Sequence, residues 1–342
     1  MLGHDMMAAM MIQTLSELYP DLRRLRFGSI VYALLTDTTP ENQQHRIILD
    51  AALREAGSRG WLTPEVFGRL RAGDDAVVLS ILDELLIAQA LDRANYSLQF
   101  NPPGEGRHVG ELLIERGDLR SFIEVKSLLP AEAVVLAQTT LARLRDLAST
   151  IPLAARLTLE ITHHPNSGIS HREVRRYLHV AAEQMLSGWT HPAAYTHSSG
   201  IYLRPVDCQP LPEAEHLQID LYQEEYPGLA RRAHRAWCDR LWRAIRGGYT
   251  QLPAGEPAVI IVVDHAQPAP PLEAWLAPLG DMLRMGAHHR LSAVIRIELA
   301  SLRTGQPALT IFHNPRASSP LVSQPILGQH ELHISMLNPE TW

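Results

Sequence analysis

The chain has 342 residues, 46% of them hydrophobic, which is enough to bury a large core in one domain or two. The net charge of −6 and the pI near 6.3 exclude a generally basic surface, so any nucleic-acid-binding surface has to be local. Two cysteines, Cys208 and Cys238, exclude a disulfide framework and favour a reducing, cytoplasmic location. The short apolar run at residues 6–12 predicts neither a signal peptide nor a membrane span.

Residues 1–73 form the first predicted region, and it is helical. Helical patterns cover residues 14–26, 28–36 and 40–56, and Thr63-Pro64-Glu65 is a typical helix start. No combination of acidic and basic side chains in this region suggests catalysis. We therefore expect a helical cap or a small partner-binding region.

A further helix begins at Asp74-Asp75 and carries Glu84. Glu84 interrupts an apolar face, because it lies at helical spacing with Val77, Ile81, Ala88 and Leu91. A carboxylate in that position needs a partner, because burying an unpaired charge is costly. A metal ion or a lysine ammonium would serve, and a surface glutamate beside Asp83 is an equally weighted alternative.

A β-hairpin follows, with strands at residues 109–116 and 119–127 joined by Gly117-Asp118. A two-residue turn at this point predicts the register, with the pairs Leu113–Phe122, Ile114–Ser121, Glu115–Arg120 and Glu111–Glu124. Residues i and i+2 share a face of a strand, so Glu111, Glu124 and Lys126 are expected on the same side of the hairpin.

Lys126 is the only lysine in the protein, since 30 of the 31 basic residues are arginine. A lysine is a compact point charge with a tunable pKa, whereas arginine is a planar fork that stays charged. The position of the one lysine, two residues after Glu124 on a predicted strand, favours a functional role over a chance placement.

Two carboxylates opposite each other in an antiparallel pair repel, so something should offset the charge of Glu111 and Glu124. Mg²⁺ is the natural candidate, because it binds through one or two carboxylates, water and substrate phosphate. The alternative is a solvent-exposed hairpin whose charges are screened by salt. The apolar character of both strands argues against that alternative.

This pattern of an acid, a hairpin and an apolar strand with Glu124-x-Lys126 resembles the PD-(D/E)xK nuclease superfamily. The resemblance covers residues 74–163, and the helix with Glu84 is similar to the helix that often carries a further family glutamate. The chain departs from the family where Gly110-Glu111 replaces Pro-Asp. Asp118 is another candidate for the first acid, but it falls in the turn and cannot share a face with Glu124.

The resemblance implies a mixed α/β fold with a helix, three strands, a helix and a strand around a central sheet. It implies a metal-dependent nuclease, a hydrolase of phosphodiester bonds, with DNA favoured as substrate and RNA left open. Mg²⁺ is the implied cofactor, with Mn²⁺ as a substitute, and its ligands would be Glu111, Glu124 and Glu84. Lys126 would complete the catalytic set. A catalytically inactive module that binds nucleic acid or protein is the main alternative, and a hydrolase of small phosphoesters is a third.

The expected nuclease core spans residues 74–165, and its last helix and strand are predicted at 130–149 and 156–162. In this superfamily the last strand would lie beside the strand of Glu124 and Lys126. Residues 166–342 are expected to form a C-terminal α/β extension that continues the same sheet or forms its own. Its elements are predicted at 171–187, 200–205, 227–247, 258–264, 271–285, 291–299 and 307–313.

The helix predicted at 227–247 carries an arginine stripe, formed by Arg232, Arg235, Arg243 and Arg246. Such a stripe can follow a phosphate backbone, although a solvated face in an arginine-rich protein is the more ordinary interpretation. Asp264-His265 at a strand end could act as an acid–base pair, but it is left out of the predicted site. Nucleic acid is the expected partner, a membrane is not, and a homo-oligomer stays open.

Overall fold

The structure is a computed structural model. It describes residues 14–22, 25, 29–71, 74–102, 111–129, 132–163, 170–196, 200–222, 227–265, 270–284, 288–302, 307–321, 326 and 331–335. The chain divides into two compact units. Unit 1 comprises Met1–Pro20, Thr39–Pro130 and Arg231–Trp342, and unit 2 comprises Asp21–Thr38 and Ala131–Ala230. Unit 2 is therefore largely an insertion between two parts of unit 1.

Unit 1 is built on a seven-stranded mixed sheet with the order β1-β2-β3-β8-β9-β10-β11. Its strands are β1 (Ser97–Phe100), β2 (Leu112–Arg116), β3 (Leu119–Leu128), β8 (Ala258–Asp264), β9 (Ala293–Glu298), β10 (Leu309–His313) and β11 (Glu331–Ser335). The first three strands pair antiparallel, and β3, β8 and β9 pair parallel. Strand β10 is antiparallel to β9 and parallel to β11.

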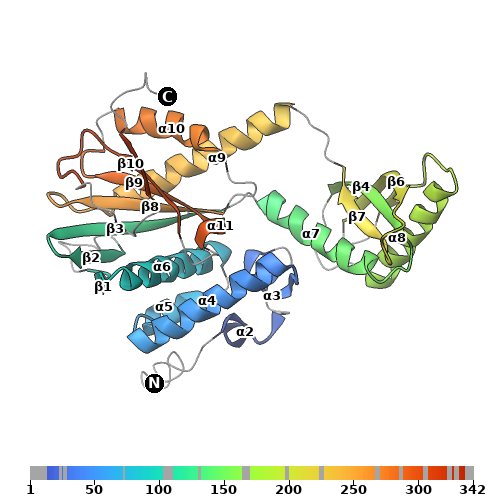
Figure 1. The fold of residues 1–342 in the computed structure, drawn as a ribbon, viewed down its shortest axis with the longest axis horizontal. Helices are drawn as coiled ribbons and strands as arrows, with labels where there is room; N and C mark the ends of the chain where they lie inside the picture. Colours follow the sequence, from blue (N-terminus) through green and yellow to red (C-terminus); the bar gives the residue numbers. More distant parts are fainter. Residues whose placement is uncertain are drawn as a thin grey trace. The chain divides into compact units, whose positions relative to one another are not determined.

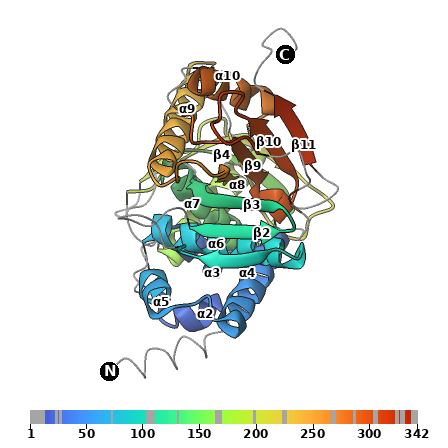
Figure 2. The ribbon, with the colours of Figure 1, turned by 90° about the vertical axis from the view of Figure 1, so that its left-hand side faces the viewer.

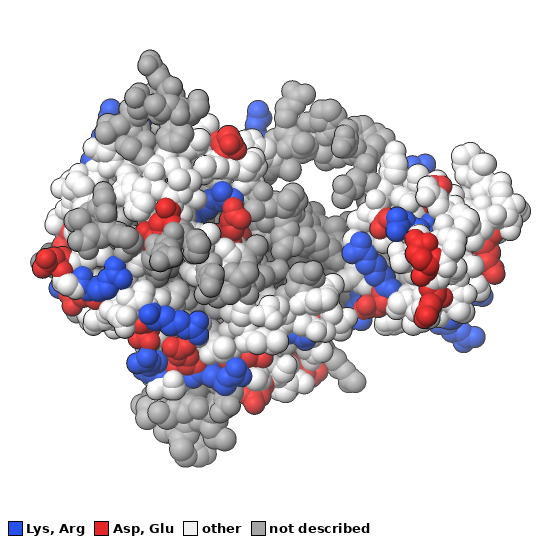
Figure 3. All heavy atoms as spheres, viewed as in Figure 1, with Lys and Arg blue, Asp and Glu red and all other residues white. Residues whose placement is uncertain are grey.

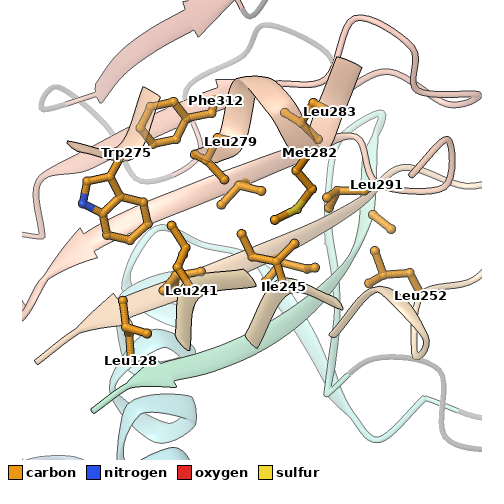
Figure 4. Packing of buried hydrophobic residues seen from close by; sticks show 14 of the residues in the cluster. Leu128, Leu241, Ile245, Leu252, Trp275, Leu279, Met282, Leu283, Leu291 and Phe312 are labelled. Atoms are coloured by element: carbon orange, nitrogen blue, oxygen red, sulfur yellow. The ribbon is translucent and has the colours of Figure 1, made fainter. Parts of the chain in front are cut away.

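Helices cover both faces of this sheet (Figures 1 and 2). On one face, α9 (Pro227–Tyr249) and α10 (Leu272–Arg284) form a hydrophobic core with alternate residues of β3 and β8 (Figure 4). On the other face, α6 (Asp75–Arg93) packs against β3, and α4 (Pro40–Arg59) and α5 (Pro64–Arg71) pack against α6. A short helix, α11 (Leu299–Leu302), follows β9.

The hairpin register is confirmed in the described strands, where Leu113 pairs with Phe122 and Glu115 with Arg120. Gly117 in the turn has a φ of 59°, in the left-handed region that glycine adopts without strain. The predicted cap of α6 is also confirmed, because the Asp74 carboxylate accepts hydrogen bonds from the backbone N–H groups of Ala76 and Val77.

The helix predicted over residues 14–26 is much shorter in the structure. Helix α2 (Leu15–Leu18) begins with a capping box between Thr14 and Glu17 and ends before Pro20, which has no backbone N–H to continue it. Helix α3 (Ile30–Thr36) lies in the part of the chain that belongs to unit 2. The helices predicted at 40–56 and from residue 63 onward correspond to α4 and α5.

Unit 2 has a four-stranded sheet with the order β5-β6-β4-β7. Its strands are β4 (Ala155–His163), β5 (Tyr195–Thr196), β6 (Tyr202–Pro210) and β7 (Gln218–Leu221). Helices α7 (Glu132–Ala148) and α8 (His171–Leu186) form a separate hydrophobic core with this sheet. Strand β6 contains Pro205 and Pro210. The register shift between Thr158 and Leu159 of β4 leaves Val206 of β6 as the extra residue, next to Pro205, which has no N–H for the ladder.

The prediction of which strand lies beside β3 was wrong. The strand predicted at 156–162 is β4, which lies in the sheet of unit 2, and the parallel neighbour of β3 is β8. The boundary predicted at residue 165 therefore does not separate the units, since α7 and β4 belong to unit 2. The strand order explains the difference: a central strand needs apolar residues on both faces, and all seven residues of β8 are buried. Of the predicted C-terminal extension, β8 to β11 continue the sheet of unit 1, whereas α8 and β5 to β7 belong to unit 2.

Candidate active site

Strand β3 is longer than its partner β2, and the predicted site lies on the part of β3 that extends past Leu112. The alternation of side chains places Glu124 and Lys126 on the same face as Phe122 and Leu128, which pack in the core under α9 and α10. Glu124 and Lys126 place two charged side chains among the apolar residues of this face. A buried acid and a partly exposed base therefore share one face of a central strand.

Lys126 joins the two acids of the hairpin. Its ammonium donates a hydrogen bond to Oε1 of Glu124, and its Nζ atom lies 3.9 Å from Oε1 of Glu111. Glu124 is fully buried, whereas the side chain of Lys126 is 21% exposed. The predicted clustering of Glu111, Glu124 and Lys126 is thus confirmed.

Glu111 is fixed at the start of β2 by two backbone contacts. Its N–H donates to the carbonyl of Ile123 at 2.9 Å, and its Oε2 accepts a hydrogen bond from the N–H of Val125 at 2.7 Å. The carboxylate thus accepts from a backbone N–H of β3 at the point where β2 begins. This anchoring holds the carboxyl group beside Lys126.

Glu84 reaches the cluster from α6. Its Oε1 accepts a hydrogen bond from Ser80 at 3.3 Å, and its carboxyl group shares a hydrogen bond with that of Glu111. Glu84 is buried and also feels the charge of Lys126. The structure therefore brings together all four predicted site residues, and the alternative of a surface Glu84 is wrong.

Burial is the main influence on the charge of the cluster. It raises the pKa of Glu84 and of Glu111, and the neighbouring charge of Glu84 raises that of Glu111 further. Burial and then the charge of Glu111 raise the pKa of Glu124 to about 7. Burial alone would lower the pKa of Lys126, but Glu111 and Glu124 outweigh it and raise that pKa, so the ammonium stays charged.

Helix α9 closes over the buried acid at Gly248. A Cβ atom at this position would lie 3.1 Å from Cγ of Glu124 and 3.1 Å from Cδ1 of Ile260. Glycine is thus the residue that lets α9 approach β3 and β8 closely. Sequence spacing gave no sign of this contact, because Gly248 and Glu124 lie far apart in the chain.

The carboxylates of Glu111 and Glu124 are suitable ligands for a hard cation such as Mg²⁺. Carboxylate oxygens are the ligands that Mg²⁺ prefers, and Oε2 of Glu124 is buried without a hydrogen-bond partner. Across the described ranges, no group of three or more His, Cys, Asp or Glu residues is arranged to hold a metal ion. Mg²⁺ needs only one or two carboxylates when water and a substrate phosphate supply the rest. Glu111 and Glu124 are such a pair, so the donor chemistry fits.

A second polar cluster lies on the opposite face of β3, and the prediction missed it. The carboxylate of Asp83 accepts hydrogen bonds from Ser127 and from Nε2 of His265, the latter at 2.7 Å. Asp83 and His265 are both buried. These contacts tie α6 to the ends of β3 and β8 beside Glu84 and Lys126. In the sequence, His265 stands out only as part of Asp264-His265, and no spacing connects residues 83 and 265.

The other sequence candidates lie away from this cluster. Asp118 is exposed in the hairpin turn, as the register requires. Arg235, Arg243 and Arg246 are exposed on α9, and the side chain of Arg232 lies outside the described residues. On the face shown in Figure 3, basic and acidic side chains are interspersed rather than gathered by sign. The exposure of Arg235, Arg243 and Arg246 agrees with the solvated-face interpretation of the arginine stripe.

Comparisons with known proteins do not assign the chain to a family. No protein-family model matches the chain, and neither the curated proteins nor the solved structures contain a match. Among the described helices, none has the length and apolar character that a membrane span requires. The function is therefore inferred from the geometry of the site.

Proposed function

We propose that the protein is a metal-dependent nuclease that hydrolyses phosphodiester bonds, with DNA as its substrate. The observation that carries the proposal is the convergence of Glu84, Glu111 and Glu124 on the single lysine of the chain. Buried acids with raised pKa values beside a charged lysine are typical of catalytic sites. The resemblance of Glu124-x-Lys126 to the PD-(D/E)xK pattern supports the same reaction class.

Each residue has a role in that reaction. Glu111 and Glu124 would hold Mg²⁺, which would polarise the phosphate and acidify water, and Glu84 would orient a water molecule at the ion. Lys126 would stabilise the negative charge that develops on the phosphate oxygens, since a fixed ammonium in a site of low dielectric is already oriented. Glu84 and Glu111 share a hydrogen bond between two carboxyl groups, so one of them is positioned to hold a proton near the attacking water.

A cleavage assay tests the proposal. Single- and double-stranded DNA and RNA are incubated with the protein in Mg²⁺, Mn²⁺ or EDTA. We expect cleavage of DNA that requires the metal and is lost in Glu124→Gln. Glu115→Gln is the matched control, because Glu115 is an exposed glutamate of the same hairpin that pairs with Arg120. Cleavage that persists in Glu124→Gln contradicts the proposed site.

The alternative is an inactive module that binds nucleic acid or protein. One observation favours it: Lys126 already contacts both Glu111 and Glu124, which offsets their charge without a cation. The replacement of Pro-Asp by Gly110-Glu111 points the same way. Binding of DNA without cleavage of any of the four substrates, in either metal, would support this alternative over the nuclease.

A further inference from the structure

Four buried N–H groups lack an acceptor at one end of the core of unit 1. Among the described residues they are Nε1 of Trp237, Nε of Arg240, Nε1 of Trp275 and Nε of Arg296. Trp237, Trp275 and Arg296 are at most 5% exposed. Leaving a buried donor unsatisfied costs about 1–3 kcal/mol, and native proteins usually satisfy such groups with water or a ligand. Four such donors in one region indicate a site that binds a group with hydrogen-bond acceptor atoms.

These groups lie close to one another. The rings of Trp237 and Trp275 meet edge to face with centroids 5.0 Å apart, and the guanidinium of Arg296 lies 5.2 Å from the ring centroid of Trp275. Arg240 follows Trp237 by about one turn of α9. The cluster therefore joins α9, α10 and β9 within the same core.

The cluster lies at the carboxyl ends of the parallel strands. Arg296 of β9 pairs with Val262 of β8, which pairs in turn with Lys126 of β3, so all three share one row and one face of the sheet. Leu128, the last residue of β3, lies at the same end of the core as Trp275 (Figure 4). In parallel α/β sheets, ligands bind outside the carboxyl ends of the strands.

Two of the four donors belong to arginine side chains, and each of these arginines has an acidic residue near it. Arg296 pairs with Glu298 at 2.6 Å and donates to the carbonyl of Pro270 at 2.8 Å through Nη2, which leaves Nε for another acceptor. Arg240 feels the charge of Asp264, the last residue of β8. The contacts of Arg296 thus use its Nη2 atom and leave its Nε atom without an acceptor.

We propose that this end of the sheet, between α9 and α10, binds a phosphate group. A phosphate offers several strong acceptor oxygens in one group, and arginine and indole N–H donors suit it. The partly exposed Arg240 would receive the phosphate first, and the buried donors would complete its contacts. The phosphate comes either from a free mononucleotide or from a nucleic-acid backbone. Binding here does not depend on cleavage at Lys126, so it goes beyond the proposed nuclease function.

Calorimetric titration of the full-length protein tests the proposal. The ligands are inorganic phosphate, a nucleoside 5′-monophosphate and an oligonucleotide without terminal phosphates, each at matched ionic strength. We expect phosphate to bind the wild type, and Arg240→Met to weaken that binding by about tenfold or more, as for loss of a charged hydrogen bond. Arg243→Met is the matched control, because Arg243 is exposed on the same helix, and its effect should stay within about twofold.

A further variant and a further condition keep the outcome clear. Trp237→Phe retains an aromatic ring but removes one donor, so it should also weaken phosphate binding, and it decides the question if Arg240→Met fails to fold. Titration in EDTA separates this site from the proposed nuclease site, because Mg²⁺ would be needed to hold a phosphate at Glu111 and Glu124. Binding of all three ligands supports a backbone phosphate, and binding without the oligonucleotide supports a free one. Absence of phosphate binding, or equal loss in Arg243→Met, overturns the proposal and leaves ordered water as the partner of these donors.

Discussion

Lys126 and Glu124 lie against each other on one face of β3, and only one carboxylate oxygen of Glu124 takes part in their contact. The second oxygen is buried without a hydrogen-bond partner. A buried charge of this kind is costly unless it is paired or coordinates a metal. The ion pair therefore leaves Oε2 of Glu124 for a second partner, and we expect that partner to be a cation.

This relationship predicts that Mg²⁺ or Mn²⁺ stabilises the fold. At concentrations many times its Kd, the metal should raise the free energy of unfolding by about 1–3 kcal/mol, because it binds the folded state alone. Glu124→Gln should remove that gain, and Glu115→Gln should keep it. Thermal unfolding with added metal and with EDTA measures the difference. Equal gains in both variants would place the metal elsewhere.

The raised pKa of Glu124 predicts how stability depends on pH without metal. In the unfolded chain this carboxyl has its ordinary pKa of 4.5, and in the folded protein the pKa is about 7. Between these values the folded state keeps a proton that the unfolded state has lost, so the free energy of unfolding falls as pH rises. Urea unfolding at several pH values should show this fall, and Glu124→Gln should make it smaller. A rise over the same range would contradict the assignment.

Substitution of Gly248 tests how closely α9 packs over Glu124, and substitution of the neighbouring Gly247 is the control. Gly248→Ala would place Cβ 3.1 Å from Glu124 and Ile260, so α9 or Glu124 must shift, at a cost of about 1–3 kcal/mol. Gly247→Ala meets nothing within 4 Å and should stabilise the helix by up to about 1 kcal/mol. Chemical denaturation of both variants measures the contrast. Similar effects in the two would show that α9 does not approach Glu124 closely.

The hydrogen bond from Ser127 to Asp83 predicts a loss of stability when the hydroxyl is removed. Ser127→Ala should cost about 1–3 kcal/mol, because the buried carboxylate of Asp83 loses a donor. Ser149→Ala, which removes an exposed hydroxyl bonded to a backbone carbonyl, should cost much less. Urea denaturation compares the two, and an equal cost would rule out a structural role for the Ser127 contact.

Local patterns predicted the hairpin and the site on it, because a two-residue turn sets the register of its strands. Glu111, Glu124 and Lys126 could be placed together from that register alone. Placement of the next strand failed because the chain leaves unit 1 after β3 and returns at α9. The alternation of residues 156–162 suits a sheet with one covered face, whereas the continuous apolar run of β8 suits the centre of a sheet. That contrast is visible in the sequence.

Contacts between residues that are distant in the sequence could not be predicted from local patterns. Asp83 and His265 are 182 positions apart, and nothing in the spacing of either residue indicates that they meet. The donors at Trp237, Trp275 and Arg296 likewise come together only through the order of strands and helices. Strand order in turn depends on which apolar faces bury each other, which involves the whole chain at once.

Substitution of Lys126 tests the central claim most directly, and the measurement is metal-dependent DNA cleavage. If the ammonium acts as a point charge beside the attacking water, Lys126→Arg and Lys126→Ala should both lose about a hundredfold or more, because the larger arginine fork cannot occupy the same position. Both variants should keep melting temperatures within a few degrees of the wild type. Near-full cleavage by Lys126→Arg would contradict the account, since it would leave no reason to regard this strand as the active site.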